Sequence, residues 1–331
     1  MSKKSSPSLV RWGLLSTARI NRSLIPAIRQ SRHSELVAIA SRSQAQASAY
    51  AHEWGIPKAH GSYEALLSDP EVDVIYNSLP NSLHPEWTIK ALEAGKHVLC
   101  EKPICLTTDE LDQIAAAAQR SGKVVTEAFM YCHHPQTLKV KELVTSGAIG
   151  ELRLIHGTFS YKLRNPENPR LDLDLGGGSI WDVGCYPISY ARWITGSEPE
   201  VVFGWQMSNP SGIDLLFAGQ MRFPDHVYAQ FDSSFDVPFR VLIEIIGSEG
   251  IIAIPNPYKP GKNDKITLTR NDETEVIRIR GQELYIGEVV DMENAILHGQ
   301  PLHISLADSR GNVAAICAFL QSSRTGKAVT L

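Results

Sequence analysis

The sequence predicts an α/β protein with a doubly wound parallel sheet, followed by an α+β domain with an open, mostly antiparallel sheet. Over residues 8–131, short apolar segments alternate with helical patterns, as in successive β-α-β units. After residue 131 the segments become strand-like and partly alternating, with turn residues between them. Because 331 residues are comfortable for two domains, we expect one at 1–131 and the other at 132–331.

The first domain is expected to repeat strand and helix regularly. Buried strands are expected at 9–15, 35–41, 72–79, 97–103 and 123–129. Helices are expected at 17–31, 43–55, 63–69, 84–95 and 107–122. Gly55, Gly95 and Gly122 end three of these helices, and Thr or Asp residues are available to cap the last one.

The second domain is expected to build its sheet from short strands flanked by helices. Strands are expected at 151–163, 200–208, 214–223, 227–235, 239–254 and 265–270. Helices that flank this sheet are expected at 135–146, 182–195, 284–298 and 305–323. The sheet face that no helix covers is expected to be apolar and to form a homodimer or a higher homo-oligomer.

Composition excludes several classes of protein. A net charge of −4 without a Lys- or Arg-dense run argues against nucleic acid as a partner. No stretch approaches 18 apolar residues, so no membrane span is expected. The basic, Ser-rich start lacks an apolar segment and is expected to be a short disordered tail, not a signal peptide. Five cysteines without a C-x-x-C pair indicate a reduced, cytoplasmic protein.

The turn after the first strand, GLLSTARIN (13–21), occupies the place of a dinucleotide-binding loop. The glycines of the G-x-G-x-x-G fingerprint are replaced by Ser16, Ala18 and Asn21. Ala18 adds only one methyl group, and Ser16 and Thr17 offer hydroxyls beside a helix start, which favours an anion. A plain strand-to-helix turn capped by Ser16 or Thr17 remains an equal alternative for this loop taken alone.

The end of the second strand indicates which dinucleotide would bind. NAD sites usually carry Asp or Glu here, whereas this chain has Ser41, Arg42 and Ser43. An arginine and two hydroxyls suit a 2′-phosphate, so NADP(H) is expected to be preferred over NAD(H). The alternative is a solvated Arg42 on an ordinary loop.

The third and fourth strands lead to polar residues at the same sheet edge. Asn81 and His84 follow the third strand, and His84 would either contact the nicotinamide region or cap the next helix. The fourth strand ends in Glu-Lys-Pro, where Pro103 restricts Lys102 to an extended backbone. The CHH tract at 132–134 lacks the spacing of a tetrahedral site, so no metal is expected.

These segments together resemble the glucose–fructose oxidoreductase, inositol dehydrogenase and rhizopine-catabolism (Gfo/Idh/MocA) family. The matching pieces are the first loop, LPNSLHPEW, AGKHVLCEKP, TEAFMYCHHPQ and GGGSIWDVGCYPISYARWITG. The resemblance implies a Rossmann domain, a second domain with an open sheet often used for oligomer contacts, and NAD(P)-dependent hydride transfer on sugars, polyols or related alcohols. The usual Asp-x-x-x-His signature reads Asp182-Val-Gly-Cys-Tyr186, which resembles the branch with dimeric dihydrodiol dehydrogenase and NADP-linked xylose dehydrogenase.

The resemblance also implies the site residues. The expected cofactor-binding residues are Ser16, Thr17, Ala18, Arg19, Ile20, Ser41, Arg42, Ser43, Leu79, Pro80, Asn81, His84, Glu101 and Lys102. Tyr186 is expected to be the acid/base, with Lys102 favouring its phenolate and bonding the reacting oxygen. Asp182 would orient Lys102 or hold a substrate hydroxyl. The alternatives are a solvated Lys102, a core Tyr186 and a capping Asp182.

The sequence thus predicts an NADP-dependent dehydrogenase or reductase acting on a CH–OH group of a sugar, a polyol or a cyclic diol. A non-catalytic NADP(H) sensor and a sugar–sugar oxidoreductase with tightly held cofactor are the alternatives. Substrate specificity is expected near Tyr161, Arg164 and Trp181. Residues 161–178 are expected to form a loop over the pocket, with GGGS (176–179) as a flexible approach and not a phosphate site.

Overall fold

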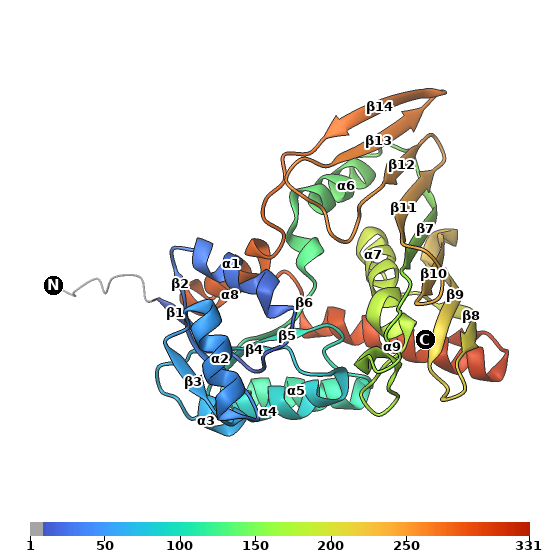
Figure 1. Ribbon diagram of the computed structural model, residues 1–331. Coiled ribbons are helices and arrows are strands. Elements are labelled where there is room, and N and C mark those ends of the chain that lie inside the picture. Colours follow the sequence, from blue (N-terminus) through green and yellow to red (C-terminus); the bar gives the residue numbers. More distant parts are fainter. Residues whose placement is uncertain (1–8) are drawn as a thin grey trace. The chain divides into compact units, whose positions relative to one another are not determined.

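The computed structural model describes residues 9–331, so the expected disordered tail lies almost wholly outside the described residues. The chain divides into two compact units (Figure 1). The first unit comprises residues up to Met130 together with Tyr285–Ser309. The second unit comprises Tyr131–Leu284 and Arg310–Leu331. The chain first crosses between the units at 130–131, one residue before the expected boundary, and the segment 285–309, expected in the second domain, belongs to the first unit.

A six-stranded parallel sheet forms the centre of the first unit. Its strands are β1 (Val10–Leu14), β2 (Ser34–Ala40), β3 (Lys58–His60), β4 (Val74–Asn77), β5 (His97–Glu101) and β6 (Val125–Ala128). The strand order β3-β2-β1-β4-β5-β6 is that of a Rossmann fold, which confirms the expected class. The order reverses between β1 and β4, and this is where open α/β sheets bind ligands. The sequence missed β3, which is only three residues long.

Helices connect the strands of the first unit. They are α1 (Asn21–Gln30), α2 (Gln44–Trp54), α3 (Tyr63–Leu67), α4 (His84–Glu93) and α5 (Thr108–Ser121). Thr107 caps α5 in a capping box with Glu110, as the residue types at this helix start predict. β1 is almost entirely buried, as expected for a parallel strand with both faces covered.

The helix α8 (Ile286–His298) was expected to flank the second sheet but packs in the first unit, in contact with α1. The carboxylate of Glu293 accepts hydrogen bonds from the hydroxyls of Ser31 and Ser34. Farther along this segment, the Ile304 carbonyl accepts a bond from Thr126 Oγ1 at 2.9 Å. These polar contacts attach the returning segment to the parallel sheet.

A nine-stranded sheet forms the second unit. Its strands are β7 (Leu152–Ser160), β8 (Val201–Ser208), β9 (Asp214–Arg222), β10 (Tyr228–Ser234), β11 (Arg240–Gly247), β12 (Ile251–Ile254), β13 (Lys265–Arg270), β14 (Glu273–Arg278) and β15 (Val329–Thr330). The order is β14-β13-β12-β11-β7-β10-β9-β8-β15, and among the described residues of this sheet only β7 and β10 pair in parallel. This confirms the expected mostly antiparallel sheet.

Helices of the second unit cover one face of this sheet. They are α6 (Pro135–Thr145), α7 (Cys185–Thr195) and α9 (Leu306–Thr325), which begins in the first unit. Gly157 on β7 lets α7 approach closely, because a Cβ there would lie 2.6 Å from Pro187. Phe319 of α9 packs edge-on against Phe231, with ring centroids 5.0 Å apart. Within residues 9–331, no helix is both long and apolar enough to cross a membrane.

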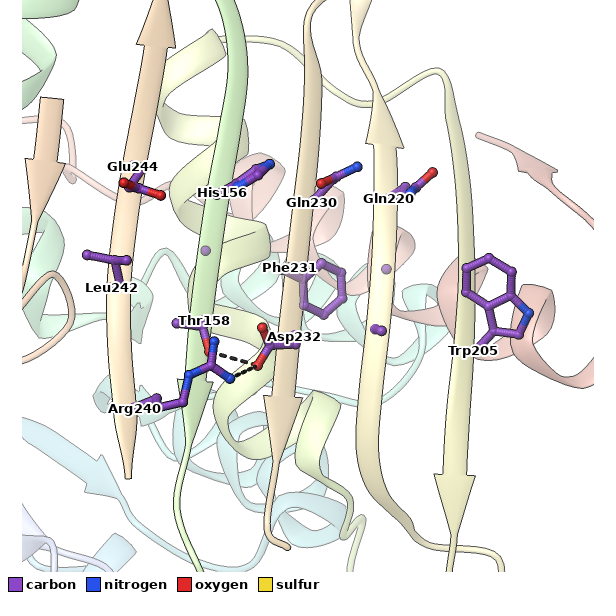
Figure 2. Close-up of a pocket in the computed structure, with 13 residues that line it drawn as sticks. His156, Thr158, Trp205, Gln220, Gln230, Phe231, Asp232, Arg240, Leu242 and Glu244 are labelled. Atoms are coloured by element: carbon purple, nitrogen blue, oxygen red, sulfur yellow. Dashed lines mark hydrogen bonds and ion pairs between the residues drawn. The ribbon is translucent and has the colours of Figure 1, made fainter. Parts of the chain in front are cut away.

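The opposite face of the nine-stranded sheet carries polar and apolar side chains together, so it is only in part the apolar surface expected (Figure 2). Strand register places Leu242, Met207 and Tyr228 among its apolar members. The polar residues in its shallow hollow are His156, Thr158, Gln220, Gln230, Asp232, Arg240 and Glu244. Trp205 lies beside them with 59% of its surface exposed. Strand alternation explains the pattern, since inward neighbours such as Phe231 are buried against the helices.

Candidate active site

The loop after β1 is built by hydrogen bonds that replace the missing glycines. Ser16 Oγ lies 2.9 Å from Ser78 Oγ and accepts a bond from the Ala18 amide at 3.1 Å. Asn21 donates to the Ser16 carbonyl at 2.6 Å and accepts from Ser78 Oγ at 2.8 Å. Asn21, at the third glycine position, thus connects the ends of β1 and β4. Neither Ser16 nor Thr17 caps α1, because the residue at its N-cap is Ile20 and no side chain bonds there.

The end of β2 leaves its charge at the surface. Arg42 is exposed, whereas Ser41 is buried and donates to Gln46 Oε1 at 3.0 Å. Ser43 caps α2 by accepting a bond from the Gln46 amide. The two hydroxyls therefore have local structural roles, and Arg42 is the residue at this strand end that carries positive charge.

His84 connects two of the segments expected to bind the cofactor. It begins α4, and its buried ring lies 2.7 Å from the Pro103 carbonyl through Nδ1 and 2.7 Å from the Leu79 carbonyl through Nε2. It does not cap α4. Burial lowers the pKa of His84 to about 4, although both hydrogen bonds oppose the shift. The ring is therefore neutral at pH 7 and donates to one of the two carbonyls at a time.

Hydrogen bonds to two carboxylates support the end of β5, directly before Lys102. Glu101 accepts a hydrogen bond from the buried hydroxyl of Tyr76 on the neighbouring strand, and another from the Lys102 amide at 3.3 Å. Beyond the strand, the Ile104 amide donates to Glu127 Oε1 at 3.0 Å. Carboxylates on β5 and β6 therefore define the backbone on both sides of Lys102. The bond between Lys102 and Pro103 is cis, which the sequence did not predict.

The residues of the first unit fit a dinucleotide. The loops after β1, β2, β4 and β5 all leave the carboxyl edge of one parallel sheet, and the strand order reverses there. Thr17, Arg19 and Ile20 complete the first loop directly before α1, whose amino terminus favours a phosphate. Leu79, Pro80 and Asn81 form the corresponding segment after β4.

In the second unit, Asp182 belongs to a short π-helix, Ile180–Gly184, that continues into α7. The sequence predicts one α-helix here. The carboxylate oxygen Oδ2 accepts the Tyr161 hydroxyl at 2.7 Å and pairs with Arg170 Nε at 2.8 Å. Burial, and next the Asp182 carboxylate, raise the pKa of Tyr161, so its hydroxyl stays protonated and remains a donor.

Tyr186 lies in the first turn of α7 and is 4% exposed. Its ring packs within an aromatic cluster, with centroids 5.9 Å from Tyr131, 5.5 Å from Phe159 and 5.4 Å from Tyr258. This packing is what a core tyrosine would show. Tyr186 also lies within electrostatic range of Arg170, which connects it to the group around Asp182.

The GGGS tract (176–179) packs closely against Asp214 and is not the flexible segment expected. Gly178 has a φ of +125°, and a Cβ there would lie 2.2 Å from Asp214 Oδ1. The other oxygen of Asp214, Oδ2, accepts Ser179 Oγ at 2.7 Å and the Ile180 amide at 2.8 Å. Burial raises the pKa of Asp214 to about 6. The tract therefore attaches the π-helix to the start of β9.

Each unit brings part of the expected site together. In the first unit Lys102 and the cofactor-loop residues share one sheet edge. In the second unit Tyr161 and Arg170 meet on Asp182, and Tyr186 interacts electrostatically with Arg170. Trp181 is buried and Arg164 is exposed. His134 of the CHH tract caps α6. The sequence missed Arg170, Ser78 and Asp214, since only folding brings them to the site.

The fold and these residues define a class, namely an oxidoreductase with a dinucleotide-binding unit and a separate α+β unit. Residues 10–129 match the model of an oxidoreductase family with an NAD-binding Rossmann fold. Residues 137–253 match the GFO/IDH/MocA C-terminal domain. The chain therefore belongs to the GFO/IDH/MocA family, as its motifs indicate, and is an NAD(P)-dependent oxidoreductase.

Individual relatives cover nearly the whole chain. An uncharacterized oxidoreductase of Rhizobium meliloti is 37% identical and covers 96% of this chain and 98% of its own length. A D-xylose 1-dehydrogenase (NADP(+)) of Haloferax volcanii is 36% identical, covering 97% of this chain and 99% of its own. The crystal structure of a 3-ketoreductase from Actinomadura kijaniata with NADP and TDP-benzene is 28% identical, with a TM-score of 0.90 over 95% of this chain and 98% of its own.

Proposed function

We propose that the protein is an NADP-dependent dehydrogenase of a sugar or polyol, with Lys102 and Tyr186 in proton transfer. The observation that carries this proposal is the pairing of two features in one chain. Lys102 follows β5 at the same sheet edge as the loop after β1, and Tyr186 lies on the helix that continues from the π-helix of Asp182. The NADP-dependent xylose dehydrogenase, 36% identical, supports the substrate class.

When bound, the nicotinamide ring would accept or donate the hydride. During alcohol oxidation the hydroxyl proton passes to Tyr186 Oη as the C–H hydride leaves the same carbon. The Lys102 ammonium bonds the reacting oxygen and favours the ionised tyrosine. Asp182 holds the group around Tyr186 and bonds a neighbouring substrate hydroxyl. In carbonyl reduction the same residues act in reverse, with Tyr186 as the acid.

NADP(H) is the expected cofactor because Arg42 is the charged residue at the end of β2. A 2′-phosphate would meet its guanidinium, with no acidic residue among the three residues there. The loop residues from Ser16 to Ile20 would hold the pyrophosphate at the start of α1. Leu79, Pro80, Asn81 and Glu101 would border the nicotinamide end.

The test is a screen of aldoses, inositols and trans-diols with NADP⁺ and NAD⁺, followed by nicotinamide absorbance. We expect turnover of a sugar with NADP⁺ preferred, and a loss of about 10²- to 10⁴-fold in kcat on replacing Lys102 by Met. Arg270→Met, in an exposed ion pair with Glu249 on the second sheet, serves as the control. NADPH binding without turnover of any compound would instead favour a sensor, and near-normal activity of Lys102→Met would refute its assignment.

We further propose that a second copy of the chain covers the face of the nine-stranded sheet opposite its helices. Trp205, Phe239 and Tyr228 are exposed on or beside this face, at 59%, 69% and 46%. Sedimentation should give a dimer that Trp205→Glu dissociates, whereas a monomeric wild-type protein would contradict the proposal. We also propose a cytoplasmic location, because none of the cysteines Cys100, Cys105, Cys132, Cys185 and Cys317 is in a disulfide bond.

A further inference from the structure

Arg170 belongs to the group around Asp182, although its place in the sequence gave no sign of this. It lies in the loop between β7 and the π-helix, in a short 3-10 turn, Pro169–Leu171. Its Nε pairs with Asp182 Oδ2 at 2.8 Å, and the same oxygen accepts the Tyr161 hydroxyl at 2.7 Å. The Asp182 carboxylate, with a smaller contribution from Tyr161 and Tyr186, raises the pKa of Arg170, so the guanidinium is always charged.

The loop backbone holds Arg170 in one place. The Arg170 amide donates to Asn168 Oδ1 at 3.0 Å, and its carbonyl accepts the Gly178 amide at 3.0 Å. A Cβ on Gly177 would lie 2.4 Å from the Arg170 carbonyl oxygen. Gly177 is therefore needed for the loop to fold back on Arg170. A loop built this closely around one residue points to a use for its side chain.

The ion pair with Asp182 leaves part of the Arg170 side chain accessible. Half of it is exposed, whereas Asp182 is 14% exposed. A guanidinium has five N–H donors, and the contact with Asp182 described above is made by Nε. Together the two side chains offer hydrogen-bond donors and acceptors with a net charge of zero. Such a pair matches the hydroxyls of an uncharged sugar and offers no net attraction to an anionic or a cationic one.

We propose that Arg170 is a specificity-determining residue that donates hydrogen bonds to substrate hydroxyls and, paired with Asp182, selects uncharged polyhydroxylated substrates. This rests on the proposed function, because it takes the group around Tyr186 as the place where the substrate reacts. A purely structural Arg170 is the competing explanation. In that case its loss would disturb the loop and lower activity on every substrate alike.

The experiment compares Arg170→Met, Arg170→Lys and the control Arg270→Met in the full-length enzyme with NADP⁺. Each is assayed on an aldose, on the corresponding uronate and on the 2-amino-2-deoxy sugar. We expect Arg170→Met to lower kcat/KM for the aldose by about 10- to 100-fold, mainly through KM, as for a lost charged hydrogen bond. In Arg170→Met, kcat/KM for the amino sugar should rise relative to kcat/KM for the aldose, because Asp182 keeps its negative charge without Arg170. Arg170→Lys should keep the charge preference but not the full affinity.

NADPH affinity, measured by fluorescence, should not change in any variant. An equal loss on all three substrates, or weakened NADPH binding, would overturn the proposal in favour of a structural role. If the wild-type enzyme turns over no sugar, the proposed function fails, and aldose binding is then followed by intrinsic tryptophan fluorescence, with Trp181→Phe identifying the contribution of Trp181. Quenching by the aldose in the wild type that is lost in Arg170→Met would support the proposal. Equal quenching in both, or none in either, would overturn it.

Discussion

Asp214 is the buried residue to which the Asp182 side of the site is attached. It is 4% exposed and holds Ser179 and Ile180 at the start of the π-helix. Since burial raises its pKa to about 6, the folded state binds a proton more readily than the unfolded chain does. This contribution to stability is complete below the unfolded pKa of 3.8 and is lost as the pH rises through about 6.

Replacing Asp214 by Asn should remove that pH dependence. Relative to Asp214→Asn, the wild-type free energy of unfolding should fall by about 1 kcal/mol between about pH 5 and pH 8. Urea unfolding at the two pH values measures the difference. Asp69→Asn is the matched control for a buried carboxylate: burial works to raise the pKa of Asp69, but its hydrogen bonds lower it overall. A pH-independent difference for Asp214→Asn would contradict the shift.

At the scale of elements, Gly177 and Gly178 of the GGGS tract determine where the π-helix starts. Gly177 lets the backbone of the preceding loop approach, and Gly178 adopts a φ of +125° directly against Asp214. A flexible tract was the expectation from composition, since glycine permits many conformations. Here the same freedom of glycine lets Gly178 adopt a positive φ that residues with a Cβ rarely adopt.

Gly178→Ala should therefore destabilise the second unit. Backbone strain and the contact with Asp214 Oδ1 should together cost at least about 2 kcal/mol. Gly212→Ala is the matched control, because Gly212 also has a positive φ of +91° but no atom within 4 Å of an added Cβ. Urea unfolding measures the loss in free energy of unfolding for both variants. Equal losses would show that the contact with Asp214 contributes nothing to the effect.

At the scale of the whole molecule, the chain returns to the first unit after completing most of the second sheet. Helix α8 and the residues after it, up to Ser309, pack in the first unit. Glu293 connects this helix to the start of β2 through Ser34, and to the end of α1 through Ser31. The stability of the Rossmann unit therefore depends on a segment about 260 residues away in sequence.

Replacing Glu293 by Ala should loosen the first unit locally. Two serine hydroxyls lose a buried charged acceptor, which should cost about 1 to 3 kcal/mol. Hydrogen exchange should accelerate in β1 and β2 but not in the nine-stranded sheet. Glu86→Ala, in an exposed pair with Lys90 on α4, should change neither. Faster exchange throughout the second unit as well would contradict a local role.

The sequence by itself determined the parallel and antiparallel sheets, because strand burial and alternation are local patterns that a single chain carries. It also determined the family, and it placed Lys102 at the end of a strand and Asp182 and Tyr186 at the start of a helix. Only the tertiary structure decided that α8 belongs with the first unit, that Arg170 and Tyr161 meet on Asp182, and that Asn21 replaces a glycine as a hydrogen-bonding centre. Those outcomes depend on contacts between residues distant in sequence, and no local periodicity records such contacts.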